Sequence, residues 1–398
     1  MAEPSAWHGF LSRFICRLYF HRITVINPEK LPRQGPVLFV GLHRNGAVDG
    51  FVYHKVLPQA VFLVSTQLRR SLLGRVFFSG IEVSRAKDGP GADNAAALER
   101  CLGHLHGGGQ LFVFPEGTSS LGPRHLPFKS GAARLALDGV DAKVPLFIVP
   151  LGVFYEEPWA FQSDVEVVVG DPVNTEPPEG TPLERLRAMK VRIAEALEEL
   201  GTNVESEEHQ DAMERLAYVS TLGTRRSYWG GLKAFEKAIP AKVLTEWEAF
   251  KPALEEDGLL RHQGVPLFPM RHGWLYVLAL AASAPVVLAA IAMNFPVYAA
   301  AWWAGRRFPD GRNVISLWKV LVGVPAFLLW FPFMTLAAFV TCCAWCALGY
   351  ALVTLLGIKL YYRTKKLAVA VNNGLRRPDL RDRVLDFREA VLRELPDV

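Results

Sequence analysis

A histidine and an aspartate six positions apart, His43 and Asp49, are the pair in this sequence best suited to acid–base chemistry. A neutral imidazole accepts a proton near neutral pH, and a carboxylate on its other ring nitrogen orients the ring and stabilises the imidazolium. The apolar run that precedes His43 predicts a β-strand that delivers the histidine at its end. Because such pairs are common by chance, their meaning depends on what the chain places beside them.

Three further clusters also stand where predicted strands end. Residues 80–85 form a short strand that finishes in Arg85. In Phe114-Pro-Glu-Gly-Thr-Ser-Ser120, a hydrophobic strand stops at a proline and presents Glu116 and several hydroxyls. Residues 144–152 form an apolar strand that contains two prolines. The pattern predicts that a mixed sheet gathers these clusters.

The four blocks, in this order, resemble the glycerolipid acyltransferase family, the membrane-bound glycerol-3-phosphate and lysophosphatidate (1-acylglycerol-3-phosphate) acyltransferases. The resemblance covers roughly residues 35–155. It implies O-acyl transfer from acyl-CoA or acyl carrier protein to a hydroxyl of a glycerol phosphate, in phospholipid biosynthesis. The acyl donor is then a co-substrate, and the resemblance implies no cofactor, no metal and no nucleic-acid partner.

The same resemblance assigns roles by position. His43 is the expected base and Asp49 its orienting partner. The expected substrate-binding residues are Arg85 at a phosphate, Glu116, Gly117 and Thr118 at the glycerol phosphate, Lys129 at a phosphate or oxyanion, and Pro150 on the acyl side. Three of these have plain structural alternatives: Arg85 as a salt-bridged strand-end residue, Glu116 as a helix-cap carboxylate, and Lys129 as a solvated surface lysine.

One departure from the common family pattern concerns the first block. Five residues separate His43 from Asp49 where the commonest pattern has four, and this longer spacing resembles a fungal-type glycerol-3-phosphate acyltransferase branch. The acceptor therefore stays open between glycerol-3-phosphate, lysophosphatidate, and another lysolipid such as a lysophospholipid or a lyso-ornithine lipid. A silent membrane scaffold that binds lipid is the alternative from a different class.

The remaining strands and helices support an α/β domain around these blocks. Predicted strands cover residues 23–26, 37–42, 60–65, 81–84, 110–114, 146–153 and 165–169, and predicted helices cover 48–56, 71–78, 92–106 and 130–138. Residues 5–21 have aromatic and aliphatic side chains at helical spacing. They predict a helix that either lies in a membrane interface or packs on the domain.

Charged residues are distributed unevenly over the 398 residues of the chain. No charged residue occurs between Trp274 and Ala304 or between Val320 and Ile358. At about 1.5 Å per helical residue, the first run exceeds one span of a roughly 30 Å hydrocarbon core, and the second allows two spans. We expect breaks near Pro285, at Asn294 and Pro296, and a turn near Trp330–Pro332.

Together these patterns predict an α/β acyltransferase-type mixed sheet flanked by helices, a helical linker region and C-terminal transmembrane helices. The predicted parts are an N-terminal amphipathic helix in 1–22, the acyltransferase domain in 23–175, a helical linker or lid in 176–270, a membrane region of two hairpins or three to four helices in 271–362, and a charged tail in 363–398. Basic residues flank both apolar runs, so the positive-inside rule favours cytosolic ends for the membrane helices, and a catalytic domain on that same side lies at the cytosolic face.

Overall fold

The computed structural model describes residues 6–84, 94–256 and 258–395, and the chain divides into two compact units. The first unit consists of residues 1–159, 165–203 and 309–317, and the second of residues 160–164, 204–308 and 318–398. The short segment Pro309–Leu317, far along the chain, thus belongs with the N-terminal half. The five-part division expected from the sequence stays a prediction.

A seven-stranded sheet forms the centre of the first unit. Its strands stand in the order β1, β7, β6, β2, β5, β3 and β4. Their bounds are Arg22–Ile26 (β1), Val37–Gly41 (β2), Ala60–Ser65 (β3), Ile81–Val83 (β4), Gln110–Val113 (β5), Phe147–Tyr155 (β6) and Asp164–Val169 (β7). The five strands from β6 to β4 pair in parallel, and β7 pairs antiparallel to β6. The predicted mixed sheet is confirmed.

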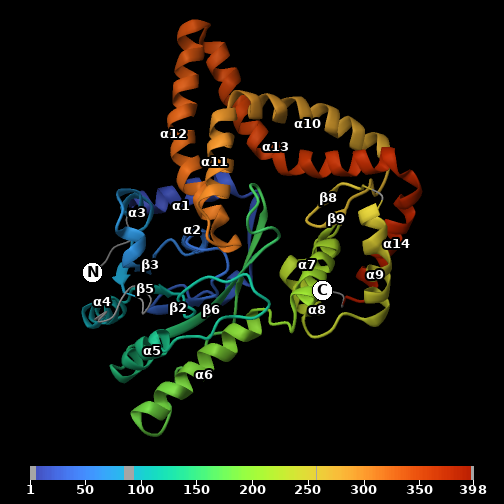
Figure 1. The fold of residues 1–398 in the computed structure, drawn as a ribbon. Helices are drawn as coiled ribbons and strands as arrows, with labels where there is room; N and C mark the ends of the chain where they lie inside the picture. The colour runs from blue at the N-terminus through green and yellow to red at the C-terminus, as the bar shows by residue number, and fades with distance from the viewer. Residues whose placement is uncertain (1–5, 85–93, 257, 396–398) are drawn as a thin grey trace. The chain divides into compact units, whose positions relative to one another are not determined.

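Helices cover both faces of this sheet because the chain reverses its direction across it. It moves from β2 outward to β3 and β4, then returns through β5 to β6 on the other side of β2. Right-handed crossovers in opposite directions place their helices on opposite faces. Figure 1 shows α1 and α2 on one side of the sheet and α5 and α6 on the other. The bounds are Ala6–Tyr19 (α1), Val48–Val56 (α2), Leu72–Phe77 (α3), Ala95–His106 (α4), Gly131–Asp141 (α5) and Pro182–Leu200 (α6).

The central strand β2 is buried at every position. Its uninterrupted apolar sequence is typical of a strand that is covered on both faces. Its last residue is Gly41, and the ring of Phe112 from β5 occupies the space beside it. A Cβ added at Gly41 would lie 2.2 Å from the Phe112 ring. Tyr53 of α2 packs on the same ring, with 4.6 Å between ring centroids. This close packing fixes the end of β2, where His43 follows.

Helix α1 packs on the first unit through one face. Leu11 and Ile15 are buried, and the helix contacts α2 and α3. Trp7 and Phe10 remain about half exposed, although the Trp7 indole donates a hydrogen bond to the carbonyl of Val76 in α3. Helix α1 therefore packs on the domain through one face, and a membrane-interface role for its aromatic end stays a prediction.

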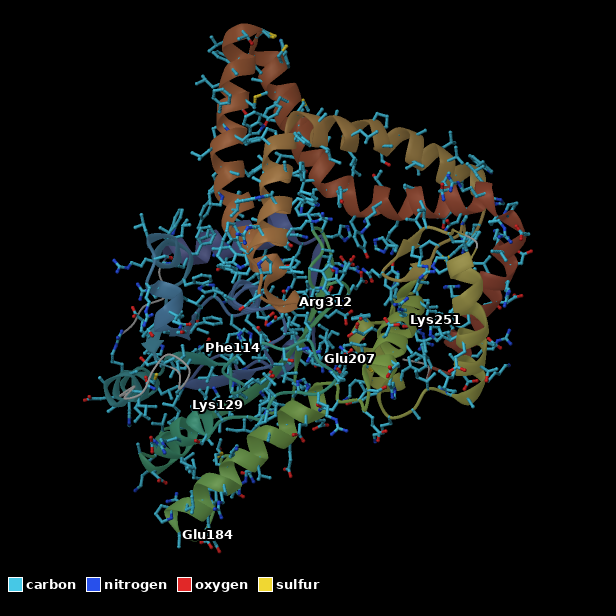
Figure 2. The ribbon with its side chains drawn as sticks, viewed as in Figure 1. Phe114, Lys129, Glu184, Glu207, Lys251 and Arg312 are labelled. Carbon is cyan, nitrogen blue, oxygen red and sulfur yellow. The ribbon has the colours of Figure 1, made fainter. Side chains whose placement is uncertain are left out.

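Within its described residues, the second unit is built from helices and one small hairpin. Its elements are α7 (Glu207–Thr221), α8 (Tyr228–Glu236), α9 (Ala241–Glu256), β8 (Arg261–His262), β9 (Val265–Pro266), α10 (Gly273–Met293), α11 (Phe295–Arg307), α12 (Ile315–Thr341), α13 (Ala344–Arg376) and α14 (Arg381–Arg393), with the first residues of α12 assigned to the first unit. Figure 2 shows the side chains on these helices.

Three helices of the described chain are long and apolar enough to cross a membrane: Gly273–Met293, Arg312–Thr341 and Ala344–Arg376. Two predicted interruptions are wrong, because α10 continues through Pro285 and α12 continues through Pro332 to Thr341. Proline removes one main-chain hydrogen bond, which neighbouring helices and local adjustments tolerate in apolar helices. The predicted break at Asn294 is where α10 ends and α11 begins.

Candidate active site

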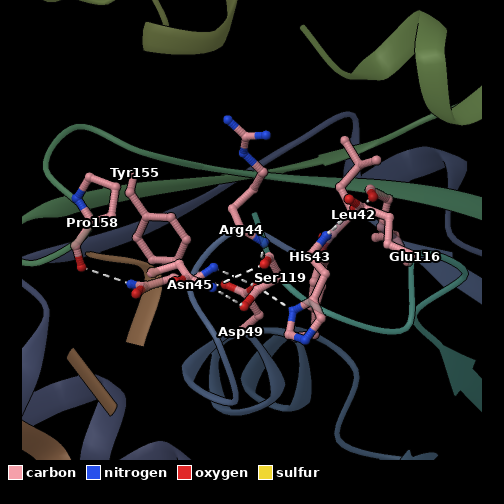
Figure 3. Close-up of polar contacts among 12 residues, drawn as sticks. Leu42, His43, Arg44, Asn45, Asp49, Glu116, Ser119, Tyr155 and Pro158 are labelled. Atoms are coloured by element: carbon pink, nitrogen blue, oxygen red, sulfur yellow. Dashed lines mark hydrogen bonds and ion pairs between the residues drawn. The ribbon is translucent and has the colours of Figure 1, made fainter. Parts of the chain in front are cut away.

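The first site residue, His43, lies two residues beyond the end of β2, where the carboxyl ends of the parallel strands meet. This edge is where open α/β sheets bind ligands. The Nδ1 atom of His43 lies 2.9 Å from Oδ2 of Asp49 in the first turn of α2 (Figure 3). The Asp49 side chain is fully buried, whereas the His43 side chain retains 14% of its exposure. The ring is therefore held from one side and reachable from the other.

The five-residue connection between this pair folds back onto the carboxylate. The main-chain N–H groups of Arg44 and Asn45 donate to Oδ2 of Asp49 at 2.7 and 2.8 Å. Gly46 turns the chain into α2 with a φ of 54°, a left-handed conformation that favours glycine. The connection thus supplies two amide donors to the carboxylate that binds the histidine ring.

A buried tyrosine completes the set of donors to Asp49. The hydroxyl of Tyr155, the last residue of β6, donates to Oδ1 of Asp49 at 2.5 Å. Burial, and then the charge of Asp49, raise the pKa of Tyr155 well above its ordinary value. The phenol therefore stays protonated and acts as a donor. Since the carboxylate accepts from every neighbour, His43 Nδ1 carries the proton and Nε2 is the free basic nitrogen.

The second buried carboxylate, Glu116, binds the main chain rather than the ring. Its Oε1 accepts a hydrogen bond from the His43 N–H at 2.9 Å, and its Oε2 accepts one from the Leu126 N–H at 3.2 Å. Burial raises the pKa of Glu116, and these two hydrogen bonds oppose the shift. Its role in shaping the acceptor pocket stays a prediction, and the structure adds that it fixes the position of His43.

The loop that carries Glu116 contacts His43 at two more points. The ring of Phe114 stacks on the imidazole with 4.0 Å between centroids. The N–H of Ser120 donates to the carbonyl of His43 at 3.0 Å. One loop, residues 114–120, therefore contacts the histidine at its N–H, its carbonyl and its ring.

The remaining predicted residues lie at different places in the first unit. Gly117 follows Glu116 with a φ of 70°, and the ammonium of Lys129 lies 2.6 Å from where a Cβ of Gly117 would be, so Lys129 and the Glu116 loop are brought together. Thr118 follows on the same loop. Pro150 lies within β6, paired with Val40 of β2, three residues before the histidine.

The predicted phosphate residue, Arg85, lies outside the described residues. Next to it, Ser84 and Asn94 form two mutual hydrogen bonds of 2.9 and 2.8 Å, through the Ser84 N–H and its carbonyl. The roles expected of Arg85, Thr118, Lys129 and Pro150 toward substrate stay predictions.

Two contributors to the site escaped the sequence analysis. Tyr155 is 106 positions from Asp49, and Asn45, whose side-chain amide donates to the carbonyl of Pro158 at 2.8 Å, looks like an ordinary loop residue. The apolar block that includes Pro150 predicts a strand that ends close to Tyr155, but the sequence does not predict that this strand lies beside β2. Asn45 belongs to the His-x-Asn-x-x-Val-Asp pattern behind the resemblance to the fungal-type branch, but that resemblance gives it no role.

The family model described as Acyltransferase matches residues 22–153, which confirms the predicted resemblance for that part of the chain. Glycerol-3-phosphate O-acyltransferase 2 of Saccharomyces cerevisiae is 35% identical over 83 residues, which is 20% of this chain and 11% of that protein. A probable 1-acyl-sn-glycerol-3-phosphate acyltransferase of Mycoplasma pneumoniae is 28% identical over 135 residues, covering 32% of this chain and 49% of that protein. The chain therefore spans about half of the second relative and about a tenth of the first.

Among solved structures, the 1-acyl-sn-glycerophosphate (LPA) acyltransferase PlsC of Thermotoga maritima aligns with a TM-score of 0.36 at 19% identity. The alignment covers 48% of this chain and 78% of that one.

Tyr155→Phe tests the donor set around Asp49. Removal of the hydroxyl leaves one oxygen of a buried carboxylate without its partner, which costs about 1–3 kcal/mol of unfolding free energy. It also lets the carboxylate turn away from the imidazole, so we expect kcat to fall about tenfold. Thermal unfolding and acyl-transfer assays measure the two effects.

Tyr218→Phe is the matched control. It removes an equally buried hydroxyl that forms a hydrogen bond with Nδ1 of His262 in the second unit instead of with Asp49. We expect a comparable loss of stability and a kcat within about twofold of wild type. Equal losses of kcat in the two variants would contradict a specific role for Tyr155.

Proposed function

We propose that this protein transfers a fatty acyl chain from an acyl thioester to a hydroxyl of a glycerol phosphate. The observation that carries the proposal is the geometry of His43: Nδ1 bonded to a buried carboxylate, and a partly exposed ring whose Nε2 is free to accept a proton. The acyltransferase family match over residues 22–153 supports the same reaction class.

In the proposed mechanism the acceptor hydroxyl supplies the nucleophile. His43 Nε2 takes its proton while the hydroxyl oxygen attacks the thioester carbonyl, and Asp49 stabilises the imidazolium. The tetrahedral intermediate collapses with cleavage of the carbon–sulfur bond. The leaving thiolate of coenzyme A or acyl carrier protein takes the proton from His43, which regenerates the base and forms no acyl-enzyme.

We propose glycerol-3-phosphate or lysophosphatidate as the acceptor. The ammonium of Lys129 beside Gly117 provides one cation near the Glu116 loop, and Arg85 follows β4 in the sequence. Arginine and lysine side chains suit a phosphate. The names of the two relatives include both acceptors, and the five-residue spacing between His43 and Asp49 favours glycerol-3-phosphate through its resemblance to the fungal branch.

We also propose that the protein is integral to a membrane, with the acyltransferase unit on the cytosolic side. Basic residues lie at the start of α12 and within the C-terminal half of α13, whereas the turn between them carries none. The positive-inside rule then puts these basic segments in the cytosol and the turn at residues 341–343 on the opposite side.

His43→Ala tests the reaction. Loss of the general base removes the proton transfer, so we expect acyl transfer to fall by about 10²–10⁴-fold with the amount of membrane-associated protein unchanged. His106→Ala is the control, because His106 is an exposed histidine on α4. A His43→Ala variant with near wild-type turnover would rule out the proposed base.

An acceptor panel tests the substrate. We expect purified protein with one labelled acyl-CoA to acylate glycerol-3-phosphate or lysophosphatidate at least about 10-fold faster than acceptors without a phosphate. The reason is that the cations of a phosphate-binding site stay unpaired when the acceptor has no phosphate. Activity confined to a lyso-ornithine lipid would refute a phosphate acceptor. Bound lipid without turnover on any acceptor would instead indicate the scaffold function.

Thiol labelling in intact cells tests the orientation. Cys342, Cys343 and Cys346 are exposed at the α12–α13 turn, whereas Cys16 and Cys101 are buried. We expect a membrane-impermeant maleimide to label the three turn cysteines from outside. A His106→Cys substitution made with these three cysteines changed to serine should react only after permeabilisation. The reverse pattern would place the acyltransferase unit on the outer side.

A further inference from the structure

The strongest unassigned feature of the first unit is the segment Pro309–Leu317, which lies in the chain between α11 and α12 and outside the acyltransferase match. Its contacts converge on the two loops that form the active site. The sequence offers no sign of this, because the nearest site residue it contacts is more than a hundred positions away.

Asn313 forms hydrogen bonds with the loop of residues 114–120, which contacts His43. Its side-chain amide donates to both the carbonyl and the hydroxyl of Ser119, at 3.0 and 2.7 Å. Ser119 directly precedes Ser120, whose N–H binds the carbonyl of His43, and the same loop supplies Glu116 to the His43 N–H. A two-bond contact to Ser119 therefore fixes the far end of the loop that positions the histidine.

The same segment also limits the connection between His43 and Asp49. A Cβ added at Gly46 would lie 3.0 Å from the carbonyl oxygen of Asn313 and 3.1 Å from Cγ1 of Val314. The turn into α2 thus packs directly against the segment. The connection that contains the extra residue therefore packs against Asn313 and Val314.

A second anchor lies at Ser316. Its hydroxyl donates to the carbonyl of Pro158 at 2.5 Å and lies 3.0 Å from the hydroxyl of Tyr19. The carbonyl of Pro158 also accepts from the side chain of Asn45, two residues beyond His43. Asn313 and Ser316 of the segment therefore contact groups that bind the His43–Asp49 connection or the loop facing it.

We propose that Pro309–Leu317 is part of the acyl-transfer site and that Asn313 is a positioning residue for His43. This inference rests on the proposed acyl transfer. Asn313 acts through Ser119 and Ser120 and does not touch the reacting atoms. A shift of about 1 Å in a catalytic group is enough to lower a rate by about 10²-fold, so a remote contact of this kind has a measurable effect.

Asn313→Ala in the full chain tests the proposal. We expect kcat to fall about tenfold, with the KM for donor and acceptor within about twofold of wild type, because the base is misplaced while the substrate sites are kept. Asn174→Ala is the matched control: Asn174 is an exposed asparagine of the same unit whose amide binds Glu176, and its kcat should not change. An unchanged kcat in Asn313→Ala overturns the proposal.

Ser119→Ala and the double variant separate positioning from general damage. Ser119→Ala removes one of the two acceptors, so it should lower kcat less than Asn313→Ala does. Because both changes break one shared contact, the double variant should be no slower than Asn313→Ala alone. Losses that multiply would show independent effects and overturn the positioning role. Ser119→Ala also decides the matter if Asn313→Ala fails to fold, since a kcat equal to wild type would then contradict the proposal.

The reaction of His43 with diethyl pyrocarbonate, mapped by mass spectrometry, gives a readout independent of turnover. We expect the carbethoxylation rate of His43 to rise severalfold in Asn313→Ala and to stay at the wild-type value in Asn174→Ala. A wild-type chain without acyl transfer would refute the proposed function, and the modification rate would still test the contact. Equal rates in all three proteins would overturn the inference itself.

Discussion

The arrangement of the first unit depends on one buried carboxylate, that of Asp49. It accepts hydrogen bonds from the His43 ring, from two successive main-chain amides and from the Tyr155 hydroxyl. An unpaired charge of this kind, fully removed from water, would cost several kcal/mol. The donors come from the strand end of β2, the connection to α2 and the end of β6, so the satisfied carboxylate requires these three elements to meet at the same edge of the sheet.

The two buried carboxylates, Asp49 and Glu116, bind different groups of the same histidine. Asp49 binds the imidazole, and its position decides the tautomer and the direction of the free nitrogen. Glu116 binds the His43 N–H and with it the main chain, while Ser120 binds the carbonyl. Ring and backbone are thus held by different loops. A general base needs a fixed ring and a fixed backbone, because rotation of the ring and displacement of the backbone each misplace the nitrogen that accepts the proton.

The sequence was most informative where a local pattern determines the structure. The helix predicted over residues 48–56 is α2, and the strand predicted over 60–65 is β3, because apolar periodicity and the residues flanking it act within one element. The His43–Asp49 pairing followed from the same local reasoning. In the apolar region the same reasoning failed at Pro285 and Pro332, because a proline signal that ends a helix in water does not end one among apolar helices.

The parts that the sequence left out are those fixed by distant partners. Tyr155 reaches Asp49 only because β6 runs parallel beside β2, and Asn313 reaches Ser119 across 194 positions. Neither residue belongs to a motif, since a single hydroxyl or amide donor is common everywhere in a chain. Their identification needs the strand order and the return of Pro309–Leu317 to the first unit.

In the proposed mechanism, chemistry and specificity depend on different residues. The pair of His43 and Asp49 would activate any hydroxyl that reaches Nε2, so it would set the reaction class and not the acceptor. Selection between acceptors must come from groups that meet the rest of the molecule, and the cation of Lys129 beside Gly117 is one that the structure places near the base-holding loop. In a site that binds phosphate, such charged groups discriminate strongly because an acceptor without a phosphate leaves them unpaired. With Lys129 in the proposed phosphate-binding role, a substrate change is expected to come from substitutions around Lys129 and Gly117, while substitutions around Asp49 are expected to change the rate for every acceptor alike.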